Sequence, residues 1–297
     1  MKILIAGSHG LVGTALIKSL EAEGHEIFRL VRHYPGSEAE IEWSPDRYSI
    51  QLARLEGFDA VVNLAGESIA ERWTEEKKRR IRESRVKGTK LLGDALANLT
   101  QPPKTFICAS AIGYYGNRGD ELLTETSAPG DDFLAQVCVE WEQATALATE
   151  KGIRVVNARF GVILDAKGGA LAKMLPPFRM GVGGKIGSGE QWMSWIALDD
   201  VVGALKFALV NETLNGPVNF VAPNPVTNAE FTKTLGKVLS RPTLFPIPAF
   251  GVRWLFGEMA DALLLASQRV EPSKLRDVRY EFLNPDLDGA LRRALQR

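Results

Sequence analysis

Lys2-Ile-Leu-Ile-Ala6-Gly7-Ser8-His9-Gly10-Leu11-Val12-Gly13 is the stretch that decides the fold of this chain. Its apolar run at 2–6 predicts a short strand that is buried on both faces of a parallel sheet. Apolar residues then recur at helical spacing and predict a helix over 11–23, which ends at Gly24. Residues 25–31 predict a second strand, so the chain opens with a βαβ unit.

The same alternation continues along the chain. It predicts strands at 60–64, 105–109, 153–160 and 217–222, and helices at 75–99, 134–151, 196–210, 228–239 and 250–268. Strands that alternate with helices imply right-handed crossovers and an α/β fold with a doubly wound parallel sheet. Glycine and proline become frequent after residue 165, which indicates a second, smaller unit.

The composition excludes several classes of protein. The content of 45% hydrophobic and 24% charged residues is typical of a globular protein, and 36 basic residues balance 36 acidic ones. A balanced charge provides no field that would draw the protein to nucleic acid or anionic lipid. The first apolar run is too short for a signal peptide or a membrane helix, so we expect a cytoplasmic protein. Cys108 and Cys138 lack metal-ligand spacing, and we expect both to be reduced and buried.

Three glycines, Gly7, Gly10 and Gly13, lie between the first strand and the first helix. The first permits a tight turn, the second lets a pyrophosphate approach the backbone, and the third lets the helix pack closely. The free N–H groups at the start of the helix favour phosphate. The spacing G-x-x-G-x-x-G differs from the dehydrogenase fingerprint G-x-G-x-x-G, and a structural turn is the alternative. We expect a dinucleotide to contact Gly7, Ser8, His9, Gly10, Leu11, Val12 and Gly13.

The end of the second strand, Val31-Arg32, bears on the choice between NAD and NADP. A carboxylate at this point binds the ribose of NAD, whereas an arginine accommodates the additional phosphate of NADP. Since Arg32 could make charge-assisted hydrogen bonds to that phosphate, we expect NADP(H). A solvated surface arginine is the alternative. Leu64, Ala65 and Gly66 end the next strand with a backbone that could lie against the cofactor.

The helix predicted at 75–99 carries two kinds of charge. In its charged run at 75–80, Glu75 and Glu76 each precede an arginine by four residues. Exposed ion pairs explain this run better than nucleic-acid binding does. Arg85 shares a helical stripe with apolar residues and should face the sheet, where a buried guanidinium needs an anion. That anion is either the cofactor or a structural carboxylate.

Further motifs are spread over nearly the whole chain. They are Asn63-Leu64-Ala65-Gly66, Ser84-Arg85 before Gly88-Thr89, Ser110-Ala111 with Tyr114-Tyr115-Gly116, Gly187-Ser188-Gly189-Glu190-Gln191 before Trp195-Ile196 and Asp199-Asp200, and Ser267-Gln268-Arg269-Val270 through Pro272. With the glycine loop, they resemble the extended short-chain dehydrogenase/reductase superfamily and, more closely, its atypical branch of epimerase family proteins. The resemblance implies a cofactor along the glycine loop, Val31-Arg32, Leu64-Ala65 and Arg85, with Gly161 and Ile163 near the nicotinamide.

One departure from the superfamily concerns the proton relay. Active members carry a serine and a Tyr-x-x-x-Lys motif on the helix that begins here near Phe133, and the lysine lowers the pKa of the tyrosine. This helix contains neither residue. If Glu142 is aligned with the acidic residue that often follows the motif, Leu134 and Cys138 occupy the two places. Ala111 stands at the serine place.

Other residues could supply the chemistry. Ser110, Tyr114 and Tyr115 follow a predicted strand end, where open α/β sheets place their ligands, although packing or ligand contact is the alternative. Gln191, Trp192 and Trp195 follow a glycine-rich loop and either shape an apolar substrate pocket or form a core. Asp199-Asp200 indicates a helix start or an ion pair.

These patterns together predict an NADP(H)-dependent oxidoreductase or epimerase-like protein with an unknown, small and partly apolar substrate. A non-catalytic NADP(H) sensor or interaction module is the alternative, which the absent Tyr-x-x-x-Lys favours. We expect a Rossmann-like domain at 1–165 and 197–222 and an interleaved C-terminal substrate lobe at 166–196 and 223–297. We also expect a monomer or homodimer, with no nucleic acid, membrane or metal partner.

Overall fold

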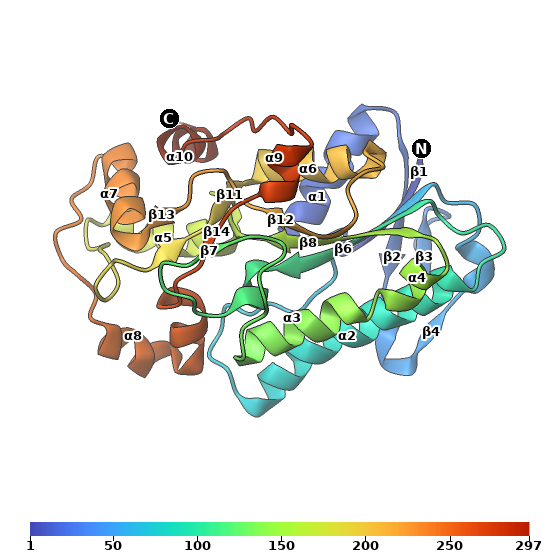
Figure 1. Ribbon diagram of the computed structural model, residues 1–297, viewed down its shortest axis with the longest axis horizontal. Helices are drawn as coiled ribbons and strands as arrows, with labels where there is room; N and C mark the ends of the chain where they lie inside the picture. The colour runs from blue at the N-terminus through green and yellow to red at the C-terminus, as the bar shows by residue number, and fades with distance from the viewer. Residues whose placement is uncertain (297) are drawn as a thin grey trace.

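A mostly parallel eight-stranded sheet forms the centre of the protein in the computed structural model, which describes residues 1–296 (Figure 1). The strand order is β12-β8-β6-β5-β1-β2-β3-β4. The strands are β1 (Lys2–Ala6), β2 (Glu26–Val31), β3 (Glu40–Ser44), β4 (Ser49–Ile50), β5 (Ala60–Asn63), β6 (Thr105–Ala111), β8 (Arg154–Phe160) and β12 (Gly216–Phe220). The edge strand β4 runs antiparallel to β3. The predicted doubly wound α/β fold is confirmed.

The order of the strands reverses at β1. From β1 the chain builds outward through β2 and β3, and then crosses back to β5, β6, β8 and β12 on the other side. In such sheets a ligand crevice opens at the carboxyl ends of the strands, where the order reverses. The glycine loop follows β1 directly and therefore lies at this crevice.

Helices cover both faces of the sheet. In Figure 1, α1 (Leu11–Ala22), α6 (Leu198–Val210) and α9 (Ser273–Asp277) lie above it, and α2 (Glu75–Ala97), α3 (Phe133–Gln143) and α4 (Ala146–Glu150) lie below it. Successive side chains of a strand point to opposite faces, so β1 contributes to two cores. Ile3 and Ile5 pack with α1 and α6, whereas Leu4 and Ala6 pack with α2, and all four are fully buried.

A third region lies beside the sheet, at the left of Figure 1. Its elements are β9 (Val162–Asp165), α5 (Gly169–Arg179), β10 (Trp192–Met193), β11 (Trp195–Ala197), β13 (Val226–Thr227), α7 (Asn228–Leu239), α8 (Ala249–Phe256) and α10 (Leu287–Leu295). Trp195, Phe231 and Leu291 lie in one buried cluster there, so segments far apart in the sequence share this core. The short strands β7 (Leu122–Leu123) and β14 (Arg269–Val270) pair with each other.

Two predicted helices are interrupted in the structure. The helix predicted at 134–151 is divided into α3 and α4, and at the break the Thr145 hydroxyl donates to a backbone carbonyl three residues earlier. Such side-chain hydrogen bonds compete with helix continuation. The helix predicted at 250–268 stops at Gly257, whose φ of 61° lies in the left-handed region that glycine adopts without strain. A π-helical turn, Ala260–Leu264, follows it.

An acidic pair at the start of α6 holds the C-terminal segment. The helix predicted from residue 196 begins two residues later, because the preceding residues pair with β9 as β11. Asp200 is buried, and its carboxylate accepts hydrogen bonds from the backbone N–H groups of Leu283 (2.6 Å) and Asn284 (3.0 Å). Asp199 forms an ion pair with Arg293 at 2.6 Å. These contacts attach the end of the chain to α6.

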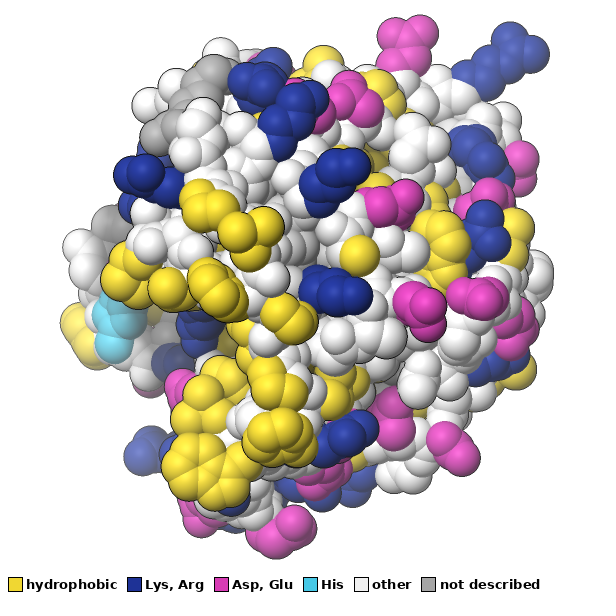
Figure 2. Space-filling view, turned by 90° about the vertical axis from the view of Figure 1, so that its left-hand side faces the viewer, with side chains coloured by type: hydrophobic (Ala, Val, Ile, Leu, Met, Phe, Trp, Pro, Cys, Tyr) yellow, Lys and Arg dark blue, Asp and Glu magenta, His cyan; other side chains and the backbone are white. Residues whose placement is uncertain are grey.

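Hydrophobic side chains gather on the end of the molecule that carries α7 and α8 (Figure 2). The most exposed of those in α8 and the segment before it are Leu244, Phe245, Phe250 and Trp254. This apolar surface belongs to the C-terminal region and not to the segments predicted to bind the cofactor.

Two expectations from composition bear on the core and the surface. Cys108 and Cys138 are free and buried, as predicted. Within residues 1–296, the structure contains no helix that is both long and apolar enough to span a membrane.

Candidate functional site

The first and third glycines of the loop are required by the packing of the protein itself. Gly7 has a φ of 79°, and a Cβ atom there would lie 2.6 Å from the carbonyl carbon and oxygen of Leu64. A Cβ atom at Gly13 would lie 2.2 Å from the Gly7 carbonyl oxygen. Both distances are far below van der Waals contact, so neither position can hold a larger residue without movement of the backbone.

The middle glycine is different. Gly10 is exposed, has a φ of −75° that any residue adopts, and a Cβ atom there would approach the protein no closer than 3.4 Å. It is also the N-cap of α1, where no side chain caps the helix. The first N–H groups of a helix have no partner within the helix, so those of α1 face outward beside a position without a side chain. This geometry suits the approach of a phosphate group.

The other strand ends extend this surface. Val31 is buried at the end of β2, and the next residue, Arg32, is exposed. The loop that begins after β5 is held in place by Asn63, whose side chain accepts a hydrogen bond from the Ala65 N–H (3.2 Å) and donates one to Thr89 (2.9 Å). The predicted cofactor segments therefore meet at one edge of the sheet.

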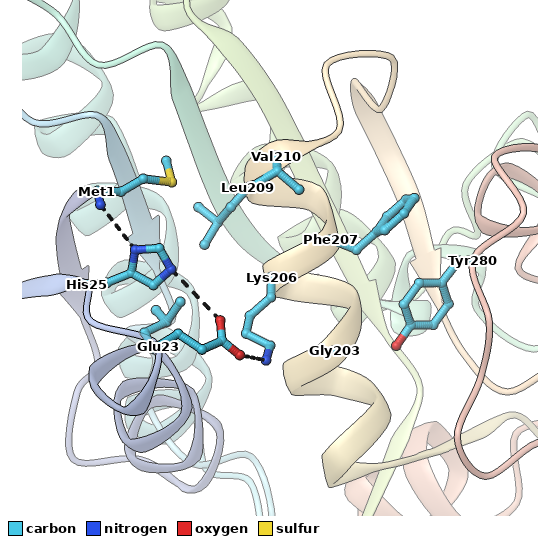
Figure 3. Close-up of a pocket in the computed structure, with 10 residues that line it drawn as sticks. Met1, Glu23, His25, Gly203, Lys206, Phe207, Leu209, Val210 and Tyr280 are labelled. Atoms are coloured by element: carbon cyan, nitrogen blue, oxygen red, sulfur yellow. Dashed lines mark hydrogen bonds and ion pairs between the residues drawn. The ribbon is translucent and has the colours of Figure 1, made fainter.

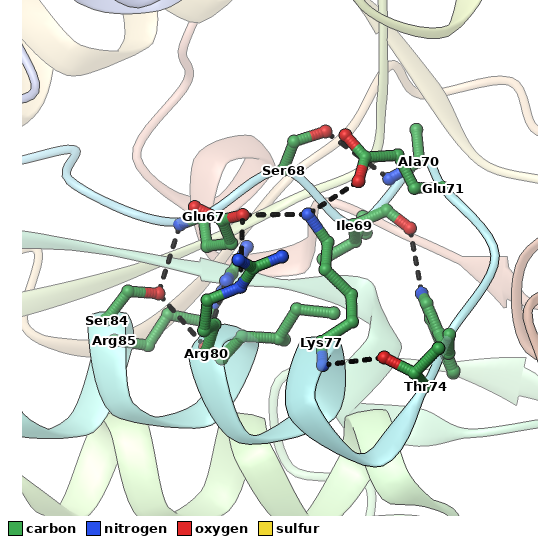
Figure 4. Close-up of polar contacts among 12 residues, drawn as sticks. Glu67, Ser68, Ile69, Ala70, Glu71, Thr74, Lys77, Arg80, Ser84 and Arg85 are labelled. Carbon is green, nitrogen blue, oxygen red and sulfur yellow. Dashed lines mark hydrogen bonds and ion pairs between the residues drawn. The ribbon is translucent and has the colours of Figure 1, made fainter.

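A charged cluster lies directly after this loop (Figure 4). The buried Lys77 ammonium group pairs with Glu67 at 2.7 Å and with Glu71 at 3.0 Å. The hydrogen bond from Lys77 lowers the pKa of the Glu67 carboxyl, and the charges of Lys77, Arg80 and Arg32 lower it further. The predicted pairing of Glu76 with Arg80 is not what the structure shows, because Glu76 pairs with Arg79 and Arg80 turns toward Glu67.

Arg85 faces the sheet, as the helical stripe predicts. Its guanidinium lies against Gly66, donates a hydrogen bond to the Ile81 carbonyl at 3.1 Å, and lies 5.1 Å from the ring centre of Trp141. Burial lowers the pKa of Arg85. Among the residues that the structure describes, no carboxylate forms an ion pair with Arg85. The structural-carboxylate alternative therefore finds no support in the geometry.

The ends of β6 and β8 carry a buried polar network. Arg159 donates to both carboxylate oxygens of Glu142, at 2.7 and 2.8 Å, and the Ser110 hydroxyl donates to the same carboxylate at 2.7 Å. The Arg159 and Ser110 side chains are each about 2% exposed. Sequence reasoning used Glu142 only as an alignment marker and missed Arg159. The available signal was an arginine inside an apolar strand, because buried cations are almost always paired.

The two candidate tyrosines on the 3-10 turn η3 (Ile112–Tyr115) occupy different environments. Tyr115 is fully buried, and its hydroxyl donates to Asn219 (2.7 Å) and accepts from Arg159 (3.0 Å). Burial raises the pKa of Tyr115 to about 12, so its proton is held firmly. Tyr114 is only partly buried, and the Arg159 guanidinium lies 3.4 Å from its ring centre. Tyr115 is thus part of the fold, whereas the hydroxyl of Tyr114 makes no hydrogen bond within residues 1–296.

Leu134 and Cys138, the positions predicted to correspond to the superfamily tyrosine and lysine, lie in apolar surroundings. Leu134 packs in a cluster with Trp73, Ile81 and Met259, which brings the start of α2 against the C-terminal region. Cys138 lies one turn further along α3, and burial raises the pKa of its thiol to about 12. The thiol is therefore protonated at neutral pH and does not replace a lysine.

Two residues predicted to lie near the nicotinamide flank the end of β8. A Cβ atom at Gly161 would lie 2.6 Å from the Ser194 carbonyl oxygen, so a close crossing of chains requires this glycine. Ile163 is partly buried in β9. The segment after β9 reaches the glycine loop, because a Cβ atom at Gly168 would lie 3.2 Å from the Leu11 side chain.

The predicted substrate residues are less open than the sequence suggests. Trp195 is fully buried in the third core, and Gln191 is 8% exposed with its side-chain amide bonded to two backbone carbonyls. Trp192 is partly exposed, but its indole N–H donates to Asp120 at 2.8 Å and Arg269 lies over its ring. Trp192 is therefore the one member of this trio with a surface that a ligand could touch.

A separate cavity of about 330 Å³ lies at the other end of α1 (Figure 3). It is bordered by Met1, Glu23, His25, Lys206 and Tyr280. Met1 precedes β1 and Glu23 follows α1, so this cavity lies at the amino edge of the sheet, away from the glycine loop. Sheets of this type bind their ligands at the carboxyl edge. We therefore place the candidate site at the glycine loop and not in this cavity.

Comparisons with known families agree with this arrangement. A family model described as NAD dependent epimerase/dehydratase family matches residues 3–221, and a domain of unknown function, DUF1731, matches residues 247–294. An epimerase family protein of Mycobacterium bovis is 45% identical over 99% of this chain and 98% of its own. The human epimerase family protein SDR39U1 is 38% identical over 98% of this chain and 99% of its own.

Solved structures show the same relationship. The crystal structure of human epimerase family protein SDR39U1 with NADPH has a TM-score of 0.92 and 37% identity, and the match covers 100% of both chains. A nucleoside-diphosphate sugar epimerase from Corynebacterium glutamicum has a TM-score of 0.81 and 42% identity over 99% of this chain and 58% of its own. Both matches include the sheet and the C-terminal region. The chain therefore belongs to the NAD dependent epimerase/dehydratase family, among the epimerase family proteins.

Proposed function

We propose that the protein binds NADP(H) at the carboxyl edge of the sheet, between the glycine loop and the loop after β5. The human relative with a TM-score of 0.92 was crystallised with NADPH. The proposed contacts are Gly7, Ser8, His9, Gly10, Leu11, Val12, Gly13, Val31, Arg32, Leu64, Ala65, Gly66, Arg85, Gly161 and Ile163. When bound, the cofactor would supply a hydride donor or acceptor at its nicotinamide.

The environment of Gly10 carries this proposal. Neither its backbone angle nor its neighbours in the protein require a glycine, in contrast to Gly7 and Gly13. A glycine at that point keeps open the space above the uncapped start of α1, which a pyrophosphate would fill. Arg85 supports the same conclusion, because its half-buried guanidinium has no carboxylate partner among residues 1–296 and lies against Gly66.

Gly10→Ala tests the proposal with little disturbance of the fold. We expect the affinity for NADPH, measured by calorimetry, to fall about tenfold or more, because the added methyl group occupies the phosphate approach. The unfolding free energy should fall by only about 1 kcal/mol, the usual cost of alanine at a helix N-cap. Gly251→Ala is the control, since a Cβ atom there meets nothing within 4 Å. Wild-type protein that binds neither NADPH nor NADP⁺ would refute the proposal.

We further propose that the protein is an oxidoreductase or epimerase-like enzyme that exchanges a hydride with a small, partly apolar substrate. Tyr114 is the proposed proton donor, because it follows the carboxyl end of β6, is only partly buried, and has a hydroxyl that makes no hydrogen bond within the described chain. The Arg159 guanidinium lies 3.4 Å from its ring centre and would hold the ring in place. Ser110 and Tyr115 lie behind it in the buried network, and Trp192 would contact the substrate.

A non-catalytic NADP(H)-binding module is the second candidate function. The observation that favours it is the apolar character of Leu134 and Cys138, where active relatives of the superfamily hold the tyrosine and lysine. In this case the bound nucleotide would stabilise a surface for a partner, and chemistry at the nicotinamide would not be needed.

Turnover distinguishes the two functions. NADPH oxidation is followed by its absorbance across a panel of carbonyl compounds, for wild-type protein and for Tyr114→Phe. If Tyr114 donates the proton, the rate should fall about 100-fold or more in the variant. Tyr34→Phe is the control, because Tyr34 is 87% exposed. Tight NADPH binding without turnover on any compound would favour the non-catalytic module.

We also propose a division of the chain into two domains. The division into a cofactor domain at 1–165 and 197–222 and a substrate lobe at 166–196 and 223–297 is supported by the separate core around Trp195. A cytoplasmic location and a monomeric or homodimeric state remain predictions from the sequence.

A further inference from the structure

The cluster around Glu67 contains more positive than negative charge. Lys77 and Arg80 lie within 4.0 Å of the Glu67 carboxylate, and Arg32 and Arg85 interact with it electrostatically. Glu71 is the second carboxylate of the cluster, so four cations face two anions. The whole chain has a formal net charge of zero, so this excess is a local feature. A local excess of cations beside a ligand crevice favours an anionic ligand.

The four cations are not equally available. Lys77 is buried and shared by Glu67 and Glu71. Arg85 donates to the Ile81 carbonyl and lies against Gly66. Lys77 therefore holds the start of α2 against the loop after β5, and Arg85 faces the backbone of that loop, where we propose that it contacts another part of the cofactor.

Arg32 and Arg80 remain. Arg32 is exposed, and no hydrogen bond or ion pair fixes it within residues 1–296. The Arg80 Nε atom lies 4.0 Å from Glu67, which is too long for a hydrogen bond, and the side chain is 53% exposed. Figure 4 shows Arg80 extending from α2 toward Glu67, away from the helix-surface pairing that its sequence spacing predicts.

We propose that Arg80 is a second specificity-determining residue, which together with Arg32 binds the phosphate on the adenosine ribose of NADP(H). This inference rests on the proposed function. Arg32 approaches the ligand from the end of β2, and Arg80 approaches it from the first turns of α2. Two guanidinium groups offer planar sets of N–H donors to one phosphate, which a single exposed arginine cannot match. The Lys77–Glu67 pair is a positioning element, because it neutralises Glu67 and keeps that carboxylate from competing for Arg80.

Calorimetry with NADP⁺ and NAD⁺ tests the inference on Arg80→Gln, Arg32→Ala and Arg79→Gln. Arg79 is the matched control, since it is the adjacent residue of the same helix, carries the same charge and pairs with Glu76 on the surface. We expect Arg80→Gln to weaken NADP⁺ binding about 10-fold to 100-fold, as the loss of charge-assisted hydrogen bonds predicts. NAD⁺ affinity should stay within about twofold in the same variant, and Arg79→Gln should bind both nucleotides as the wild type does.

The outcomes separate this inference from the proposed function. If Arg32→Ala loses NADP⁺ affinity while Arg80→Gln behaves like Arg79→Gln, the inference is overturned and the proposed function stands. If Arg80→Gln weakens the binding of NADP⁺ and NAD⁺ equally, Arg80 does not bind the phosphate on the adenosine ribose, and the inference is again overturned. Arg80→Lys keeps the charge and should recover part of the NADP⁺ affinity. Wild-type protein that binds neither nucleotide would refute the proposed function itself.

Discussion

The two halves of the carboxyl edge use their polar groups differently. In the glycine-loop half, the amides at the start of α1 and the guanidinium of Arg32 form no hydrogen bonds with protein side chains in the described residues. The other half, which lies at the ends of β6 and β8, is called the reaction half. There Ser110 and Arg159 both donate hydrogen bonds to Glu142, and the network is buried. The difference teaches that the first half leaves polar groups without protein side-chain partners, whereas most polar groups of the second half stabilise the fold.

We expect the largest effect in the reaction half, from loss of the buried ion pair between Arg159 and Glu142. Arg159→Met leaves the Glu142 carboxylate buried without its cation, and we expect the unfolding free energy in urea to fall by about 3–5 kcal/mol. The double variant Arg159→Met/Glu142→Leu removes both charges and should recover most of that loss. A single variant as stable as the wild type would show that the network is not structural, and the comparison would fail.

In the glycine-loop half, we expect a smaller loss of stability when Gly7 is replaced. Gly7→Ala introduces a Cβ atom 2.6 Å from the Leu64 backbone at a φ of 79°, and we expect a loss of about 2–4 kcal/mol in unfolding free energy. Gly24→Ala is the matched control, because its φ of 78° is equally strained but nothing lies within 4 Å. The control should lose about 1 kcal/mol. Equal losses in urea denaturation would mean that close packing at Leu64 contributes nothing.

The smallest effect compares adjacent tyrosines. Tyr115→Phe leaves the Asn219 side-chain oxygen without its donor and removes one hydrogen bond from Arg159, and it should lower the unfolding free energy by about 1–2 kcal/mol. Tyr114→Phe removes a hydroxyl with no hydrogen bond in the described chain, so the change should be under about 0.5 kcal/mol. Thermal or urea unfolding of the two variants provides the measurement. The opposite ranking would contradict our division between the hydrogen-bonded hydroxyl of Tyr115 and the unbonded hydroxyl of Tyr114.

The sequence predicts the first half of the fold well, because its signals are local. The run at 2–6, the three glycines and the helix that follows all correspond to observed elements, with ends that differ by one residue at most. Strands β3 and β4 were not predicted, since Glu40–Ser44 alternates charged and apolar residues over only five positions and Ser49–Ile50 is a single pair. β4 is the edge strand and pairs only with β3, and β3 lies between β4 and β2, so pairing defines these two strands more than their own pattern does.

Some residues of the candidate site could be predicted from local sequence signals, and others could not. Arg32 and Arg85 could be singled out, because one follows a strand end and the other interrupts an apolar helical stripe. The contact of Ser110 with Glu142 joins residues 32 positions apart, and that of Tyr115 with Asn219 joins residues 104 positions apart. Spacing in the sequence carries no information on such contacts, so the buried network required the structure. The same is true of Arg80, whose partner Glu67 lies on the preceding loop.

The attachment of the chain end to Asp200 has a consequence for synthesis. Its buried carboxylate accepts hydrogen bonds from backbone N–H groups 83 and 84 positions later. The Asp200 carboxylate therefore lacks these hydrogen-bond donors until Leu283 and Asn284 have left the ribosome. Long-range contacts of this kind form late, and a nascent chain exposes incomplete surfaces until they do. The segment around α6 should therefore reach its final stability only after these two residues have emerged, and a chain shortened before residue 283 should be a target for chaperones and proteases.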